Sequence, residues 1–295
     1  MQKMALLNQI HDFIEQKTVF NDVTFHGKGV HLNKLATIVI KPSLKPGIFF
    51  QRIDIPGSLP IPAHFRFVKN TNFSTYLEKD HVSIQTIEHV LAALEGCGVT
   101  NAIIEVDGSE IPILDGSAIV FYNELIKSPL RSLNQSYPIY HLAEQIIVET
   151  SYGHIKAWPT PHSYASFHMT INAKNRFGDK LGHQSLSYSM DQDFKNIAMA
   201  RTFGCYEEGL LMQQKGLALG ASLDNTLVIK DHDILNPSGM RIDNEMARHK
   251  ILDAIGDFSL FPQKIIAHFD IYNGGHTLNH LFLQKLDSLK ISKDI

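Results

Sequence analysis

Cysteine is scarce in this sequence, since the 295 residues contain only Cys97 and Cys205. The two do not form a CxxC pair or another spaced cluster, which excludes a disulfide framework and a thiolate zinc site and favours a reducing compartment. Long apolar runs are also missing, both within the chain and in the N-terminal stretch, where a secretory signal would need one. We therefore expect a cytoplasmic protein without a transmembrane segment.

Neither sign of charge is in large excess. The 27 Lys and Arg residues nearly balance the 30 Asp and Glu residues, for a formal net charge of -3. The chain therefore lacks the excess of positive charge that is typical of proteins that bind nucleic acid, and we exclude that class of partner. A hydrophobic content of 44% with 19% charged residues is typical of a globular protein, long enough here for two small domains.

Strand-like and helix-like segments follow one another in a similar order in the two halves of the chain. In each half, β-branched or alternating runs bounded by glycine and proline precede amphipathic helical segments. A polar, proline-bearing and aperiodic segment at 128–138 separates the halves. We predict an α+β protein with an N-terminal extension at 1–16, a first domain at 17–130, and a second domain at 131–295 with an insertion at about 205–219.

The segment from Arg241 to Asp257 contains the densest group of side chains that could bind a metal or act in catalysis, and it is predicted to be one helix. His249, Asp253 and Asp257 stand at i, i+4 and i+8, so they form a single polar strip, while apolar residues project to the other side. An imidazole and a carboxylate one turn apart can bind one divalent cation such as zinc. The pattern is equally typical of a solvated helix face with an ordinary side-chain pair, so a metal site needs a third ligand elsewhere.

A second predicted helix, at 83–96, offers that third ligand. Glu88 and His89 lie on its polar side, where His89 could bind the metal and Glu88, rotated by about 100° around the helix, could reach water on it as a base. The alternative is that both residues form the wet face of an amphipathic helix. With His89, His249 and Asp253 as ligands, one zinc position stays open, as in catalytic sites for metal-assisted hydrolysis.

A hydrolase of this kind also needs an acid for the leaving group and hydrogen-bond donors for the oxyanion. His276 follows a glycine-rich turn, and Asp257 could hold its imidazole, although a lone histidine there is more often an ordinary helix-start residue. Thr202 could donate its hydroxyl to the oxyanion, or be a plain strand residue. Lys250 could contact an anionic substrate, or lie along the helix surface.

At this point the sequence resembles the zinc-dependent UDP-3-O-acyl-N-acetylglucosamine deacetylases of lipid A biosynthesis. The resemblance spans roughly residues 18–286, and its motifs occur in the order of the family, which makes the match specific. The matching motifs are Thr86–Leu94 (TIEHVLAAL), Glu110–Ser117 (EIPILDGS), Ala200–Gly204 (ARTFG), Gly216–Gly220 (GLALG), Arg248–Asp257 (RHKILDAIGD) and Gly275–Asn279 (GHTLN).

The resemblance implies a role for each matching residue, and it implies a single zinc ion as the cofactor. It implies that His89, His249 and Asp253 bind the zinc ion and that Glu88 is the general base. His276 would be the general acid or electrostatic partner, and Asp257 would orient it. Thr202 would polarise the amide carbonyl, and Phe203 and Lys250 would contact the substrate.

The implied fold is two domains of similar topology, each a β-sheet with two helices, packed so that the helices lie face to face between the sheets. A small β-α-β insertion in the second domain would form a hydrophobic passage for the substrate's acyl chain. Its candidate lining residues are Leu210, Leu211 and Met212. The implied enzyme is a cytoplasmic monomer that acts on a small-molecule nucleotide sugar and releases acetate and UDP-3-O-acyl-glucosamine.

The early turn at Gly29–Asn33 (GVHLN) departs from the family pattern in the residues after its histidine, and three single positions depart as well. Phe73 stands near the metal where a small polar or sulfur side chain is usual, Asn196 replaces an acid, and Ala221 replaces a glycine. These changes concern substrate fit and leave open a zinc amidohydrolase of the same fold with a different acylated substrate. A non-catalytic paralogue that binds a nucleotide sugar is the other alternative, but a binding protein would need neither Glu88 nor His276.

Overall fold

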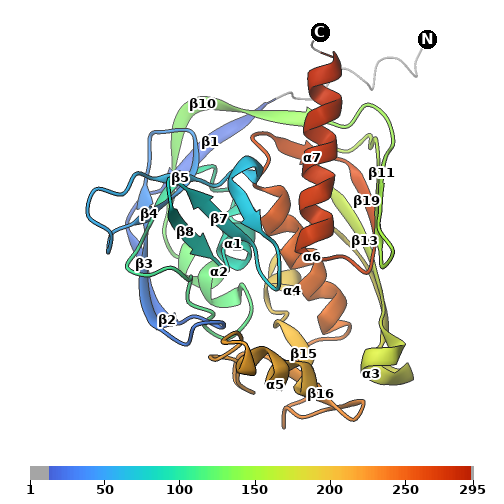
Figure 1. Cartoon of the computed structure of the whole chain (residues 1–295). Coiled ribbons are helices and arrows are strands. Elements are labelled where there is room, and N and C mark those ends of the chain that lie inside the picture. Colours follow the sequence, from blue (N-terminus) through green and yellow to red (C-terminus); the bar gives the residue numbers. More distant parts are fainter. Residues whose placement is uncertain (1–12, 294–295) are drawn as a thin grey trace, which may run out of the picture.

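The larger of the two main β-sheets in the computed structural model comes mostly from the first half of the chain (Figure 1). Residues 13–293 are described. Inward side chains such as Ile38 and Ile40 alternate with outer ones, as expected of a sheet with one covered face. The hydrogen-bonded order is β18-β10-β1-β9-β3-β2, with β4 paired to β9 and to β5. The strands are β1 (Phe13–Val19), β2 (Val23–Lys28), β3 (Leu35–Pro42), β4 (Gly47–Arg52), β5 (Ile61–Pro62), β9 (Asn101–Val106), β10 (Leu130–His141) and β18 (Lys264–Ile266).

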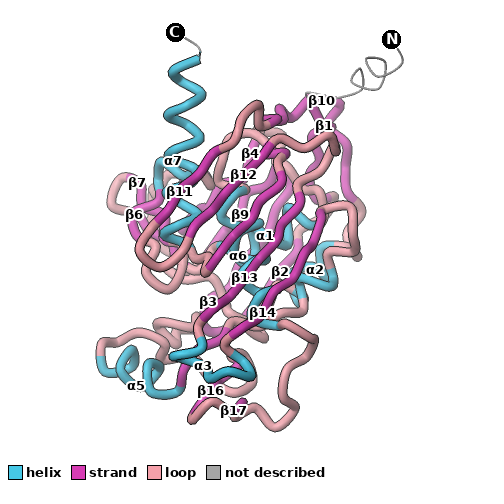
Figure 2. Tube along the Cα trace, turned by 90° about the vertical axis from the view of Figure 1, so that its right-hand side faces the viewer, coloured by secondary structure: helices cyan, strands magenta, loops and turns pink. Residues whose placement is uncertain are grey.

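The second sheet faces the first across a layer of helices (Figure 1), and Figure 2 looks onto the outer face of this second sheet. Its order is β11-β12-β19-β13-β14, and Phe167, Met169 and Ile171 of β13 point into the core while the residues between them are partly exposed. The strands are β11 (Ile146–Glu149), β12 (His154–Trp158), β13 (Ser166–Asn172), β14 (His183–Ser189) and β19 (His268–Tyr272).

Helices α1 (Glu88–Gly96) and α6 (Glu245–Phe258) pack against each other between the sheets (Figure 1). Gly256 permits this close approach, because a Cβ atom there would lie 2.1 Å from the backbone oxygen of Glu88. The layered α+β fold predicted from the sequence is therefore confirmed. Outside the predicted insertion, the remaining helices are α2 (Ile119–Leu125), α3 (Lys174–Leu181), α4 (Lys195–Ala198), α7 (His276–Lys293) and a 3₁₀ turn at Phe65–Phe67.

Two small sheets flank the helix layer. One contains β6 (Val68–Asn70), β7 (Tyr76–Lys79) and β8 (Val82–Gln85). The other contains β15 (Phe203–Cys205), β16 (Leu227–Lys230) and β17 (Asp233–Ile234), and β15 leads directly into α5 (Tyr206–Gln214). The second small sheet and α5 project from the body of the molecule (Figure 1), where an insertion was predicted.

Two predictions of local structure need correction. The segment taken for an aperiodic linker contains β10, because its backbone pairs antiparallel with β1 and parallel with β18 whatever its side-chain pattern. The helix predicted from residue 83 begins only at Glu88, since residues up to Gln85 pair with β7 and Thr86 has a positive φ of 60°. The domain boundary at 130/131 stays a proposal.

The N-terminal extension predicted at 1–16 falls mostly outside the described residues. Residues 13–16 of the predicted extension are described and belong to β1, which begins at Phe13 and pairs there with Pro138 of β10. Strand pairing therefore starts within the predicted extension.

Candidate active site

The three predicted metal ligands meet where α1 packs on α6. One ligand atom from each of His89, His249 and Asp253 lies within 4.8 Å of the other two. The His249 Nε2 atom is 3.3 Å from Asp253 Oδ1, and the His89 Nε2 atom is 3.8 Å from the same oxygen. All three side chains are buried, with exposed fractions of 4% or less. The alternative interpretations, a solvated strip on α6 and a wet face on α1, are therefore wrong.

The protonation of these groups fits a divalent cation. His249 Nδ1 donates to the backbone oxygen of Ala200 at 3.0 Å, which leaves the Nε2 lone pair free. Burial lowers the pKa of His89 to about 3 and also lowers that of His249, so both rings are neutral.

Asp253 completes this donor set as a carboxylate. Burial opposes its ionisation, but the neighbouring cations Lys250 and His276 favour the carboxylate, and its pKa is lowered. Its buried Oδ1 atom has no hydrogen-bond partner among residues 13–293. Two neutral imidazole nitrogens and a free carboxylate oxygen are ligands that zinc accepts.

Lys250 lies beside the ligands rather than along an outer helix surface. Its Nζ atom is 2.8 Å from Asp253 Oδ2, the oxygen that does not face His89 and His249, and 5.5 Å from the centre of the Phe203 ring. Each of these contacts keeps the cationic head at the edge of the metal site.

The predicted base and acid face each other next to the metal ligands. Glu88 Oε1 is 3.8 Å from His276 Nε2, and His276 Nδ1 is 2.8 Å from Asp257 Oδ2, so Asp257 does hold this imidazole. Burial raises the pKa of Glu88 to about 7. Burial alone would lower the pKa of His276, but Asp257 and Glu88 together raise it to about 9. The site thus pairs a carboxylate able to accept a proton with a histidine that carries one.

Two residues in this cluster were missed from the sequence. Asn279 donates from Nδ2 to Asp257 Oδ2 at 2.8 Å, and its spacing of three residues from His276 on one helix was a usable signal. Thr75 donates from its hydroxyl to Asp257 Oδ1 at 2.5 Å and from its backbone nitrogen to Glu88 Oε2 at 3.0 Å. No local pattern marks Thr75, because Asp257 is 182 positions away.

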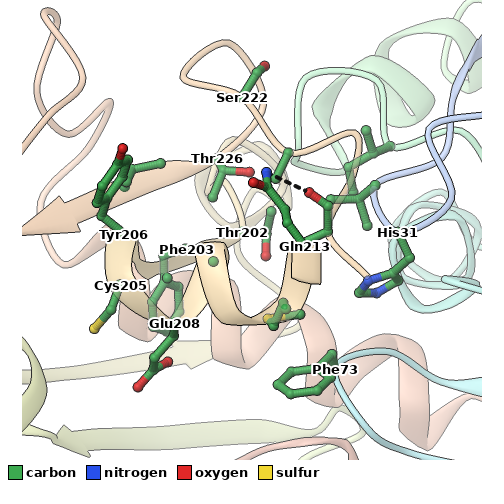
Figure 3. Close-up of a pocket in the computed structure, with 18 of the residues that line it drawn as sticks. His31, Phe73, Thr202, Phe203, Cys205, Tyr206, Glu208, Gln213, Ser222 and Thr226 are labelled. Carbon is green, nitrogen blue, oxygen red and sulfur yellow. Dashed lines mark hydrogen bonds between the residues drawn. The ribbon is translucent and has the colours of Figure 1, made fainter. Parts of the chain in front are cut away.

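Two cavities meet at the site. The wider one, about 1030 Å³, is lined by the metal ligands, Lys250 and His276. The narrower one, about 460 Å³, runs beneath the insertion and is shown in Figure 3. Thr202 and Phe203 line both cavities, as do Glu88 and His89. The arrangement opens the same reactive groups to a broad cleft and to a narrower passage.

The passage is lined by only two of its three predicted residues. Leu210 and Met212 line it, whereas Leu211 lies outside the lining with 57% of its surface exposed. Gly209, Leu210, Met212 and Gln213 all face the cavity, and Leu211 points to the opposite side of α5, since successive helical residues are about 100° apart. The prediction for Leu211 is therefore corrected.

The departures from the family pattern fall at different places. Phe73 lines both cavities with 60% of its surface exposed and a positive φ of 65°. Ala221 lines the passage, while Asn196 lies in α4 and accepts a hydrogen bond from Arg248 through its backbone oxygen. His31, not recognised from the sequence, also lines the passage, and Figure 3 shows it and Phe73 on the side away from Tyr206.

A buried triad able to hold a metal ion, open to a cleft beside the predicted acid and base, is typical of a metal-dependent hydrolase. The chain also matches the family model described as "UDP-3-O-acyl N-acetylglycosamine deacetylase" over residues 16–288, and it belongs to this family of hydrolytic enzymes. This membership confirms the resemblance drawn from the motifs and the predicted enzyme class.

Several relatives carry the name UDP-3-O-acyl-N-acetylglucosamine deacetylase, among them proteins from three different organisms. The protein from Geobacter sp. (strain M21) is 37% identical over 277 residues, which cover 92% of this chain and 89% of the relative. The protein from Myxococcus xanthus (strain DK1622) is 37% identical over 276 residues, 92% of this chain and 86% of the relative. The protein from Sodalis glossinidius (strain morsitans) is 36% identical, and the match covers 92% of this chain and 89% of the relative.

None of the helices among the described residues combines the length and the apolar character that crossing a bilayer requires.

Proposed function

We propose that this protein removes the N-acetyl group of UDP-3-O-acyl-N-acetylglucosamine, releasing acetate and UDP-3-O-acyl-glucosamine in lipid A biosynthesis. The observation that carries the proposal is the meeting of the His89, His249 and Asp253 triad with Glu88 and His276 where a polar cleft joins an apolar passage. The printed names of the relatives support the same substrate.

The cofactor we propose is one zinc ion held by His89, His249 and Asp253. When bound, zinc supplies a Lewis acid that polarises an amide carbonyl. The preference for zinc rests on the mixture of imidazole nitrogen and carboxylate oxygen in the triad, since magnesium and calcium favour oxygen ligands alone.

The side chains around the triad divide the proton transfers between them. Glu88 takes a proton from the attacking water as the new carbon–oxygen bond forms at the acetyl carbonyl. His276, protonated and held by Asp257, gives a proton to the nitrogen as the carbon–nitrogen bond breaks. The Thr202 hydroxyl, at the junction of the cavities, donates to the carbonyl oxygen as negative charge develops there. The products are acetate and a free amine.

The two cavities fit the two ends of the proposed substrate. Lys250 and Phe203 border the polar cleft, where a cation suits the diphosphate and an aromatic ring suits a sugar or acyl group. Leu210 and Met212 offer an apolar lining for the acyl chain. Each group in the site comes from one chain, so a monomer is sufficient, and we place the enzyme in the cytoplasm with its nucleotide-sugar substrate.

The test is acetate release by the purified protein, combined with metal analysis. We expect about one zinc ion per chain and turnover of the 3-O-acylated nucleotide sugar that far exceeds turnover of UDP-N-acetylglucosamine. Equal turnover of the two compounds would favour the amidohydrolase alternative. Zinc binding without acetate release from either compound would contradict the proposed deacetylation.

A further inference from the structure

Thr75 immediately precedes β7 in the chain and contacts Glu88, the first residue of α1. Its side chain is buried, with 2% of its surface exposed, and it reaches residues of α6 and α7 from the second half of the chain. It does not line either of the two cavities that meet at the site. Any effect of Thr75 on the reaction is therefore indirect.

The backbone of Thr75 orients the proposed base. Its N–H donates to Glu88 Oε2 at 3.0 Å, while the other oxygen of this carboxylate, Oε1, faces His276 Nε2 at 3.8 Å. A carboxylate rotates about the bond to its methylene group, and a hydrogen bond to one oxygen restricts that rotation. This contact leaves Oε1 as the oxygen directed toward the reacting groups.

The hydroxyl of Thr75 orients the partner of the proposed acid. It donates to Asp257 Oδ1 at 2.5 Å, and the second oxygen, Oδ2, accepts from His276 Nδ1 and from Asn279, each at 2.8 Å. The Thr75 oxygen also lies 3.3 Å from His276 Nδ1. With both oxygens of Asp257 occupied, the imidazole keeps its proton on Nδ1 and presents Nε2 to the site.

These contacts make Thr75 a link between two groups that come from distant parts of the chain. Glu88 is 13 residues from Thr75, whereas Asp257 and His276 are 182 and 201 residues away. Proton transfer depends steeply on the distance and angle between such groups, and a displacement of about 1 Å can cost roughly 10²-fold in rate.

We propose that Thr75 is a positioning residue that fixes the distance and angle between the base Glu88 and the Asp257–His276 pair. This inference rests on the proposed function. Substitution of Thr75 can remove only its hydroxyl contact with Asp257. The backbone N–H remains in every variant. Loss of the hydroxyl leaves Asp257 Oδ1 as a buried acceptor without its donor, and the carboxylate with its histidine can then turn.

The experiment compares Thr75→Val with Thr75→Ser in the zinc-loaded full chain. Valine has the shape of threonine without the hydroxyl, and serine keeps the hydroxyl. Thr18→Val is the matched control, because Thr18 is also fully buried and its hydroxyl, within residues 13–293, only accepts one hydrogen bond, from the Ser43 backbone N–H at 3.0 Å. Each variant is assayed for kcat, KM, zinc content and thermal unfolding. The hydrogen-bonded Nδ1 proton of His276 is followed by NMR and assigned with His276→Ala.

We expect Thr75→Val to lower kcat by about 10- to 100-fold with little change in KM or zinc content, and to shift or broaden the His276 Nδ1 proton signal. Thr75→Ser should restore kcat to within about threefold of the parent. Thr18→Val should keep the parent's kcat and signal. The proposal is overturned if Thr75→Val keeps both, or if Thr75→Ser is as impaired as Thr75→Val.

The NMR measurement separates failure of this inference from failure of the proposed function. If the parent protein releases no acetate, the deacetylase proposal fails, yet the His276 signal still reports the contact. A changed signal in Thr75→Val alone then supports positioning by Thr75. An unchanged signal refutes it.

Discussion

The helices that hold the proposed metal site and the insertion that lines the passage differ in how deeply they are buried. Twelve of the fourteen residues of α6 are buried, including His249, Asp253 and Asp257. None of the nine residues of α5, all of them described, is buried. Groups that must meet within a few ångströms are thus held by close packing, whereas the passage is bordered by an exposed helix.

The largest difference should appear when one carboxylate from each region is neutralised. Glu88→Gln removes the proposed base and should lower kcat by about 10²- to 10⁴-fold with zinc retained, because the ligands are untouched. Glu207→Gln changes an exposed carboxylate of α5 outside the passage lining and should stay within about twofold. Acetate release and metal analysis test both, and an active Glu88→Gln would reject the base assignment.

The second contrast concerns ion pairs. Arg201 and Glu245 are both buried and joined at 2.8 Å, and Glu245 also accepts from the Arg201 backbone nitrogen. Glu245→Ala leaves a buried cation without its partner and should cost about 3–5 kcal/mol of unfolding free energy. In the insertion, Glu208 pairs with Arg176 while both remain about half exposed, so Glu208→Ala should cost no more than about 1 kcal/mol. Denaturant unfolding measures both, and equal losses would remove the contrast.

Two glycine substitutions should change the free energy of unfolding in opposite directions. Gly256→Ala places a methyl group against the Glu88 backbone oxygen and should force α1 and α6 apart, with a loss of about 1–3 kcal/mol and weaker zinc binding. Gly209→Ala in α5 meets no atom within 4 Å and should stabilise the protein by about 0.5–1 kcal/mol through helix propensity. Thermal unfolding and zinc titration decide the matter, and tolerance of Gly256→Ala would contradict the close helix contact.

The smallest effect should separate neighbouring leucines of α5. Leu210→Ala removes part of the passage lining and should lower kcat/KM for the acylated substrate by about two- to tenfold, more for long chains than for short ones. Leu211→Ala should change it by less than about twofold, since Leu211 points away from the passage. The reverse order would restore the original prediction for Leu211.

Much of the site could be predicted from the sequence, because side-chain chemistry and helical spacing are local properties. The spacing of His249 and Asp253 and the adjacency of Glu88 and His89 are visible in the printed sequence, and helix geometry converts them into shared or neighbouring faces. The helical segment expected from residue 205 and the final helix after Gly275 were also placed correctly.

Only the tertiary structure decided which neighbours those side chains have. The same His/Asp spacing fits a solvated strip, and burial of α6 against α1 excluded that interpretation. β10 became a strand through partners more than a hundred residues away, and Thr75 joined Glu88 to Asp257 with no local pattern to mark it. The physical reason is that residue type sets what a group can do, whereas the distance between residues far apart in the chain depends on how the whole core packs.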